Sequence, residues 1–231
     1  MDKIKPNHFP KDTVAFLKKL SKNNNREWFS ANKKLYDKDF LEPAMQFVVG
    51  MGEKLQKISP RIMAIPKVDK SIFRIYRDVR FSKNKEPYKT NIGLYFWEGP
   101  GKKMEGSGFY FHLEPKRFGI GGGMYIFSKE HLKKFRDTVT DPVKGKELDS
   151  IVKKITKKGI YKVKGKHYKK TPRGYDPNSK YADYLLYNGI YGWYDGKKLN
   201  ELEGGSCVNF VYKIFKDLSP LHMWLVNNIL H

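Results

Sequence analysis

The hydrophobic pattern changes its period near residue 71, and this change limits the possible folds more than any other feature. Before it, apolar residues recur at spacings of three and four, which is typical of amphipathic helices. After it, apolar and polar residues alternate, which is typical of strands. The segments between these strands are too short for crossover helices, so we expect an antiparallel meander. The predicted strands cover 71–81, 90–98, 107–115 and 117–127.

Helices are predicted on both sides of these strands, because helix-capping residues precede segments with helical spacing. Asn25, Ser128 and Asp141 are the predicted N-caps, the last followed by a proline at the first helical position. The predicted helices cover 11–20, the segment after Asn25, the segment after Pro43, the segments after Ser128 and Asp141, 207–216, and a last one beginning at Ser219-Pro220.

The order of these elements predicts an α+β protein. A chain of 231 residues is long enough to bury a core, and it contains no internal repeat or low-complexity linker. We therefore expect a single α+β domain over 1–231, in which a meander of about four strands packs against N- and C-terminal helices. The helical N-terminal part is predicted at about 9–60, the sheet at about 71–127, and the helical C-terminal part at about 128–231.

The formal charge of +22 has two interpretations. Eight of the 46 basic residues are arginines, so the excess is one of lysine, which solvated helix faces often carry. Alternatively, a basic surface binds nucleic acid. Between 143 and 173, twelve basic residues face only Glu147 and Asp149, and Tyr161 and Tyr168 lie among them as residues that could stack on bases.

Cysteine content and hydropathy predict the compartment. Cys207 is the only cysteine, so no intrachain disulfide can form. The N-terminus lacks the apolar segment of a secretory signal, and no apolar run is long enough to span a bilayer. We expect a cytoplasmic protein without a membrane partner. The histidines show no ligand spacing, so neither a metal site nor a cofactor is predicted.

An arginine cluster is the strongest candidate for a binding site. The segment "RIYRDVRFSKNKEPYKTN" (74–91) holds three of the eight arginines within seven residues. Arginine presents a planar set of donors that binds carboxylate or phosphate through two parallel hydrogen bonds. Arg173 and Tyr175 of "TPRGYDP" are included as candidates to complete the site, with the alternative that Arg173 only fixes the loop in which it lies. The predicted ligand-binding residues are Arg74, Arg77, Arg80, Lys83, Tyr88, Lys89, Arg173 and Tyr175.

The alternative for this cluster is purely structural. Arg77 and Asp78 could form ion pairs that hold a loop in place, with Asp176 as a further partner. Such networks occur in many proteins without a ligand.

A histidine and a carboxylate fall on one face of a predicted strand. His112 and Glu114 are two residues apart, beside Tyr110. They could act as a general base and the group that orients it, or form a hydrogen-bonded pair on the sheet surface, which is the commoner case. The candidate catalytic residues are Asp78, His112, Glu114 and Asp176, and whether the protein is an enzyme stays open.

The glycine run in "GIGGGMY" does not match a phosphate-binding loop. It has neither the G-x-G-x-x-G register nor a Gly-Lys-Ser/Thr ending. Glycines 121–123 are instead expected to let a ligand, an aromatic ring or a neighbouring backbone approach the sheet closely.

Several motifs resemble one family over nearly the whole chain. They are "FLKKLSKNNNREWFSANKKLYD", "FRIYRDVRFSKNKEPYKTNIG", "FYFHLEP", "GIGGGMY", "PRGYDP" and "FKDLSPLHMWL". The family consists of uncharacterised, mostly bacterial proteins catalogued as domain of unknown function 2461, so the resemblance implies no reaction. It marks these positions as matching the signature motifs: Arg77, Asp78, Arg80, Phe81, Ser82, Lys83, Pro87, Tyr88, Lys89, Arg173, Gly174, Tyr175 and Asp176.

The sequence thus leaves three hypotheses. The first is a pocket that binds a small anionic ligand, for example a phosphorylated one, through the arginine and lysine cluster. The second is a nucleic-acid-binding protein that uses its basic surface. The third is a non-catalytic scaffold in which the arginine motif is structural.

Overall fold

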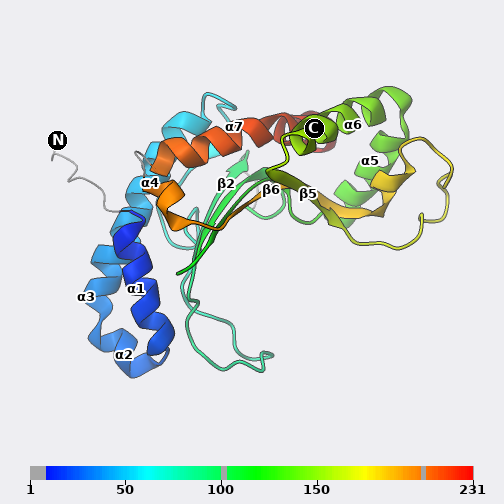
Figure 1. Ribbon diagram of the computed structural model, residues 1–231. Coiled ribbons are helices and arrows are strands. Elements are labelled where there is room, and N and C mark those ends of the chain that lie inside the picture. The colour runs from blue at the N-terminus through cyan, green and yellow to red at the C-terminus, as the bar shows by residue number, and fades with distance from the viewer. Residues whose placement is uncertain (1–8, 100–102, 204–206, 231) are drawn as a thin grey trace.

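The computed structural model describes residues 9–99, 103–203 and 207–230, and its centre is one antiparallel sheet. The order of the strands in the sheet is β1-β2-β3-β4-β6-β5, and each strand is antiparallel to its neighbours (Figure 1). The strands are β1 (Ile62–Met63), β2 (Ile92–Glu98), β3 (Gly108–Leu113), β4 (Phe118–Met124), β5 (Tyr161–Lys166) and β6 (Tyr187–Gly196).

The α+β class and the meander β2-β3-β4 are confirmed, but the expectation of about four strands is corrected to six. The segment 71–81 is not a strand, because it leaves the sheet after one bridge between Ile72 and Leu94. The strands β5 and β6 lie in the part predicted to be helical. β5 alternates (YKVKGK) but is short and has only two apolar side chains, and glycines interrupt the apolar pattern of β6, so neither segment stands out as an apolar strand.

The helices lie at both ends of the chain, as expected. The predicted N-caps are confirmed: the side chains of Asn25, Ser128 and Asp141 accept hydrogen bonds from the first turns that follow them. The helices are α1 (Lys11–Lys22), α2 (Arg26–Ala31), α3 (Lys33–Tyr36), α4 (Glu42–Leu55), α5 (Lys129–Thr140), α6 (Pro142–Lys157) and α7 (Cys207–Leu225), with short π or 3-10 turns at Asp37–Leu41, Ala182–Leu186, Leu199–Leu202 and Val226–Leu230. None of the described helices has the length and apolar character that a membrane crossing needs.

The last two predicted helices form one continuous helix, α7, with Pro220 inside it. A proline within a helix leaves the carbonyl four residues earlier without its usual donor. Here the hydroxyl of Ser219 donates to the carbonyl oxygen of Lys216 at 2.8 Å. The serine thus replaces the missing backbone donor, and the helix continues.

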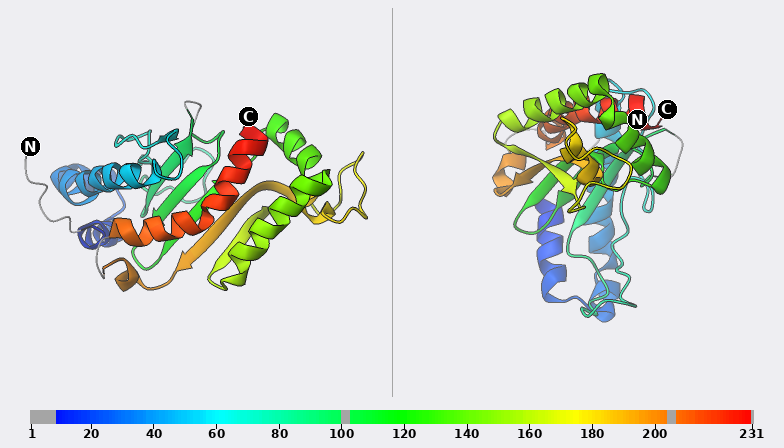
Figure 2. Two further views of the ribbon diagram at one scale, coloured as in Figure 1. Left: turned by 90° about the horizontal axis from the view of Figure 1, so that it is seen from above. Right: turned by 90° about the vertical axis from the view of Figure 1, so that its right-hand side faces the viewer.

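The sheet has one covered face and one open face. Leu94, Phe111 and Ile120 share a cross-strand row on the covered face and are fully buried. Helix α7 crosses this face, and α5 and α6 lie at one end of the sheet (Figures 1 and 2). Glycines let α7 approach closely, since a Cβ at Gly192 would lie 2.5 Å from Leu218.

No described helix packs on the opposite face of the sheet, which we call the open face. It borders a hollow instead. Helices α1, α2 and α3 and the segment 74–91 extend downward beside it, at the end of the sheet opposite α5 (Figures 1 and 2). Residues of β2, β3, β4 and β6 therefore line a recess whose side wall comes from the arginine-rich segment.

Candidate functional site

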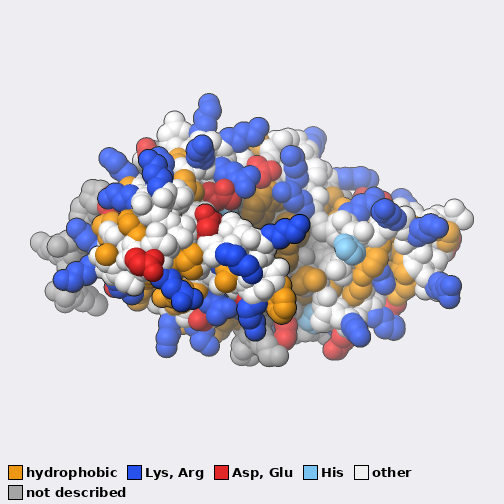
Figure 3. Space-filling model, turned by 90° about the horizontal axis from the view of Figure 1, so that it is seen from below, with side chains coloured by type: hydrophobic (Ala, Val, Ile, Leu, Met, Phe, Trp, Pro, Cys, Tyr) orange, Lys and Arg blue, Asp and Glu red, His pale blue; other side chains and the backbone are white. Residues whose placement is uncertain are grey.

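A cleft of about 640 Å³ lies on the open face. Its floor comes from β2, β3, β4 and β6, and its walls come from the segment 73–91 and from β5. Figure 3 shows the hollow from this side, with hydrophobic side chains inside it and lysine and arginine side chains around it. This volume is typical of sites for small molecules.

Two tyrosine rings on the floor lie across glycines of a neighbouring strand. A Cβ added to Gly108 would lie 2.8 Å from Cζ of Tyr95, and one added to Gly93 would lie 3.2 Å from Cε2 of Tyr110. Tyr95 and Tyr110 are paired across β2 and β3, so each ring covers the strand that carries the other. A side chain at Gly93 would displace the Tyr110 ring, and one at Gly108 would meet both the Tyr95 ring and, at 2.2 Å, the carbonyl oxygen of Phe96.

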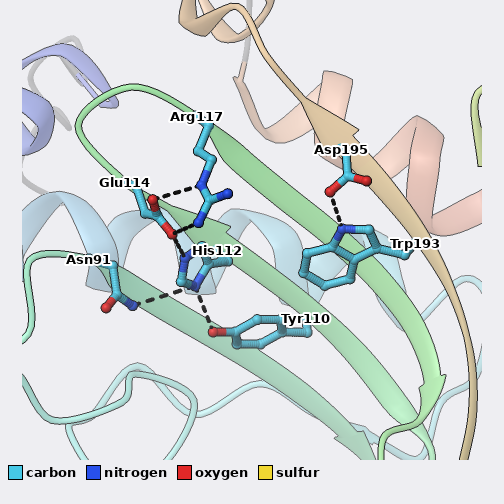
Figure 4. A network of polar contacts seen from close by, with 7 residues as sticks. All are labelled: Asn91, Tyr110, His112, Glu114, Arg117, Trp193 and Asp195. Atoms are coloured by element: carbon cyan, nitrogen blue, oxygen red, sulfur yellow. Dashed lines mark hydrogen bonds and ion pairs between the residues drawn. The ribbon is translucent and has the colours of Figure 1, made fainter. Parts of the chain in front are cut away.

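Trp193 makes the same arrangement on the other side of the floor. Its indole extends from β6 across β4, where a Cβ at Gly119 would lie 2.1 Å from Cζ2 and one at Gly121 would lie 2.9 Å from Cε3. The indole N–H donates to Asp195 at 2.6 Å, and Nζ of Lys164 lies 4.9 Å from the ring centre. These contacts hold the indole flat against the sheet (Figure 4).

The expectation for glycines 121–123 is confirmed, with a different neighbour at each position. Gly121 admits the indole of Trp193, and Gly122 admits Leu218 of α7 on the covered face. Gly123 has a positive φ of 135°, and a Cβ there would lie 2.4 Å from the carbonyl oxygen of Ile190. The three glycines therefore allow β4 to pack closely against an aromatic ring, a helix and the backbone of the neighbouring strand.

The arginine cluster folds back on itself as a hairpin-like excursion over residues 74–89, which we call the arginine hairpin. Its base is closed by hydrogen bonds from the Arg77 N–H to the Pro87 carbonyl (2.8 Å) and from the Lys89 N–H to the Ile75 carbonyl (2.7 Å). The reversal of direction brings Arg74 and Lys89 together although they are fifteen residues apart: Nζ of Lys89 donates to the Arg74 carbonyl at 3.0 Å.

Tyr88 fixes the arginine hairpin to the N-terminal helices. Its ring is buried and stacks on Phe29 at a centroid distance of 4.2 Å. The Asn24 side chain makes two hydrogen bonds to the Tyr88 backbone. Its Nδ2 donates to the Tyr88 carbonyl oxygen at 3.0 Å, and its Oδ1 accepts from the Tyr88 N–H at 3.1 Å. Tyr88, predicted to bind ligand, therefore lies outside the cleft lining and anchors the hairpin.

Four cations line the cleft. Arg74, Arg77 and Lys89 come from the base of the arginine hairpin, and Lys164 comes from β5. Asp78 also lies in the lining, but its carboxylate is bonded by Arg80. Burial lowers the pKa of Lys89, and the nearby Arg74 lowers it further. Arg77 forms an ion pair with Glu86 at 3.5 Å, and Lys164 lies 4.0 Å from Asp195. The excess of positive charge in the cleft therefore comes chiefly from Arg74 and Lys89.

The tip of the arginine hairpin points away from the cleft. Arg80 binds Asp78 through two hydrogen bonds of 3.0 and 2.7 Å, and these bonds hold the pKa of Asp78 below its usual value. Lys83 is exposed in the tip, and neither Arg80 nor Lys83 is among the residues that line the cleft. Arg80 and Lys83 lie outside the lining because the chain reverses direction in the arginine hairpin, so that only the residues near its base face the sheet.

The structure does not bring Arg173, Tyr175 and Asp176 to the cleft. They lie in the long connection between β5 and β6, at the opposite end of the sheet from the arginine hairpin (Figure 1). The hydroxyl of Tyr175 donates to Asp137 of α5 at 2.7 Å, and burial together with this bond raises its pKa to about 12. The carboxylate of Asp176 accepts from the Asn178 N–H at 2.9 Å. The structural alternative holds in part: Arg77 pairs with Glu86 at 3.5 Å and Asp78 with Arg80 at 2.7 Å within the arginine hairpin, whereas Asp176 lies elsewhere and is not their partner.

His112 and Glu114 form a hydrogen-bonded chain that ends at the cleft (Figure 4). Nε2 of His112 lies 2.8 Å from Glu114, and Nδ1 lies 3.0 Å from the hydroxyl of Tyr110. Since the carboxylate can only accept, Nε2 carries a proton and donates to it. Asn91, a lining residue, lies 3.4 Å from Nδ1 of His112.

The far end of this chain is fixed by Arg117. Its guanidinium donates to both oxygens of Glu114, at 2.8 and 3.0 Å, and these bonds lower the pKa of the carboxyl group. Burial raises the pKa of Tyr110 to about 12, so its hydroxyl remains a donor. Tyr110 and Asn91 present this network to the cleft, whereas His112 and Glu114 lie behind them. Among the described residues, no cluster of His, Cys, Asp and Glu could hold a metal ion.

Sequence reasoning missed most of the aromatic lining. Tyr191 and Trp193 belong to β6, and Lys164, which lines the cleft beside them, belongs to β5; neither segment was predicted to be a strand. Phe73 and Tyr125 lie just outside regular strands. The available signal is the spacing in "YNGIYGWYDG", where aromatic residues at 191 and 193 alternate with glycines.

Comparison with known proteins identifies a family but no characterised relative. A family model described as "Conserved hypothetical protein (DUF2461)" matches residues 12–224. Searches among curated proteins and among solved structures found no match.

Proposed function

The chain belongs to the DUF2461 family of conserved hypothetical proteins, and from this premise we propose that its function is to bind a small anionic ligand in the cleft on the open face. Arg74, Arg77 and Lys89 would bind the anionic group, and Lys164 would add positive charge from the other wall. Tyr110 and Asn91 would offer polar contacts on the floor.

The observation that carries this proposal is the convergence of cations from two separate segments on one aromatic recess. Arg77 is held by its backbone bond to Pro87, the carbonyl of Arg74 accepts from the Lys89 side chain, and Lys164 is held by the pairing of β5 with β6. Together with burial, the charge of Arg74 lowers the pKa of Lys89, and a bound anion would relieve this repulsion. A guanidinium also binds phosphate or carboxylate through two parallel bonds.

The basic segment 143–173 gives less support to a nucleic-acid interface. Its lysines are spread over α6, β5 and the loop after β5, and several are ion-paired: Lys144 with Glu147, Lys153 with Asp149, Lys158 with Asp217, and Lys166 with Asp183. These pairs are typical of a solvated surface.

Thermal melting against a ligand panel tests the proposal. The panel contains phosphate, sugar phosphates, nucleotides, dicarboxylates, and short DNA and RNA, each at low and moderate salt. A ligand at a hundred times its Kd adds about 2.7 kcal/mol of stability. For a protein of this size, that corresponds to a rise of roughly 5–11 °C in Tm.

Two variants make the test specific. The double variant Arg74→Ala/Arg77→Ala should remove the shift, whereas Arg173→Ala, an arginine far from the cleft, should keep it. A shift that survives in the double variant contradicts the proposal. Shifts from polynucleotides alone, lost at moderate salt, would favour a nucleic-acid interface. If no anion shifts the melting of the wild type, the scaffold hypothesis is favoured.

A further inference from the structure

We infer that the ligand of this cleft contains a flat aromatic ring as well as its anionic group, in the manner of a nucleoside monophosphate. This inference rests on the proposed function and names the class of ligand. It comes from the floor of the cleft, which the anion-binding residues do not explain.

The floor is a platform of rings that present their faces. One face of the Trp193 indole lies on Gly119 and Gly121, and one face of the Tyr110 ring lies on Gly93. The opposite face of each ring is thereby directed away from the sheet, and on this side Nζ of Lys164, at the end of a flexible side chain, lies 4.9 Å from the centre of the Trp193 ring. The two rings are 6.3 Å apart between centroids and inclined by only 26°, so together they form one gently bent surface.

The flat rings are made possible by glycines in the neighbouring strands. Four glycines are needed under Tyr95, Tyr110 and Trp193, and each glycine weakens its strand. Phe73 closes the side of the platform with its ring at 84° to Tyr110, as the wall of a slot. Stacking of a planar ring on such a surface adds affinity because every nucleobase has a π-face.

The charged groups lie where the substituent of a stacked ring would reach them. The arginine hairpin descends beside the platform and carries Arg74 and Arg77 into the lining. On the opposite side, Lys164 lies over the Trp193 ring. The Asn91 side chain, at the Tyr110 end, has both a donor and an acceptor for polar atoms on the edge of the ring.

Isothermal titration calorimetry with three probes separates the contribution of the aromatic ring to affinity from that of the anionic group. The probes are adenosine 5′-monophosphate, ribose 5-phosphate and inorganic phosphate, titrated into wild type, Trp193→Ala and Trp193→Phe. We expect the mononucleotide to bind roughly 5- to 150-fold more tightly than ribose 5-phosphate, which is the gain expected from stacking one base. Trp193→Ala should abolish this gain, and Trp193→Phe, which keeps a ring on Gly119 and Gly121, should retain part of it.

The possible failures have different meanings. If ribose 5-phosphate binds as tightly as the mononucleotide, the inference is overturned while the proposed anion site stands. If the mononucleotide keeps its advantage in a folded Trp193→Ala variant, the platform does not bind the ring and the inference is again overturned. If none of the three probes binds to the wild type, and none of the panel anions shifts its melting, both the inference and the proposed function fail. The far-ultraviolet circular dichroism of each variant shows that it is folded.

Discussion

Replacing Gly119 with alanine should displace the indole of Trp193 and destabilise the protein, although glycine-to-alanine changes in strands are usually favourable. The three atoms nearest to the new Cβ all belong to Trp193, at 2.1, 2.7 and 3.1 Å. Ordinary contacts of a Cβ lie at 3.4–4 Å, so the ring has to retreat by roughly an ångström or more.

The expected loss follows from what holds the ring in place. Displacement removes the contact with Lys164, worth about 0.5–1 kcal/mol at an exposed site, and the indole hydrogen bond to Asp195, worth about 0.5–1.5 kcal/mol. Alanine returns about 0.4–1 kcal/mol by restricting the unfolded chain. With the lost packing on β4, we expect the free energy of unfolding to fall by about 1–2 kcal/mol, which lowers Tm by roughly 2–8 °C.

A double-mutant cycle in urea, followed by far-ultraviolet circular dichroism, measures this coupling. Gly119→Ala should cost about 1–2 kcal/mol in the wild type but be neutral or stabilising in Trp193→Ala, where no ring has to move. Gly50→Ala in α4 is the matched control: its Cβ would meet Val208 at 3.9 Å, and helix propensity favours alanine by about 1 kcal/mol. An equal cost of Gly119→Ala in both backgrounds would refute the position of the indole.

Two further predictions concern the walls and the core. Asn24→Ala removes both side-chain hydrogen bonds to the Tyr88 backbone. The free energy of unfolding should therefore fall by about 1–3 kcal/mol, and amide hydrogen exchange in the arginine hairpin should accelerate. Unchanged exchange there would contradict the anchoring role of Tyr88. Burial would raise the pKa of Glu98, but the net shift is downward because His222 and Ser59 bond the carboxylate. Its contribution to stability is therefore present above the unfolded pKa of about 4.3 and lost as pH falls through the lower folded value. Between these two pKa values, the unfolding free energy in urea should fall more steeply with falling pH in wild type than in Glu98→Gln, and parallel curves would contradict this assignment.

Local signals in the sequence were sufficient for the helix caps and the meander. Asn25, Ser128 and Asp141 act on backbone N–H groups two or three residues away, so their role is readable without the tertiary structure. The alternation in β2 and β3 is visible because one face meets the helices and the other does not. In contrast, β6 has glycines at 189, 192 and 196 whose neighbours come from other elements, and its pattern carries meaning only once those are known.

The candidate site was predictable only in part, for a related reason. Arg74, Arg77 and Lys89 are close in the sequence and also close in the structure, because the arginine hairpin reverses the chain direction within a few residues. The division between base and tip, which leaves Arg80 outside the lining, depends on that turn. The platform of Tyr110 and Trp193 depends on the pairing of β4 with β6 over a long separation in the chain, which one sequence does not reveal.

The position of a bound anion is the most direct test of the central claim. Two-dimensional ¹H–¹⁵N spectra of the whole protein, recorded during titration with inorganic phosphate and then adenosine 5′-monophosphate, report it at each amide. The amides of Gly93, Gly121 and Gly123 lie in the floor, and those of Arg74 and Arg77 lie in the wall. The account predicts saturating shifts at these five positions, with the floor glycines responding more to the mononucleotide. Shifts confined to the lysine-rich segment 143–173 would contradict it.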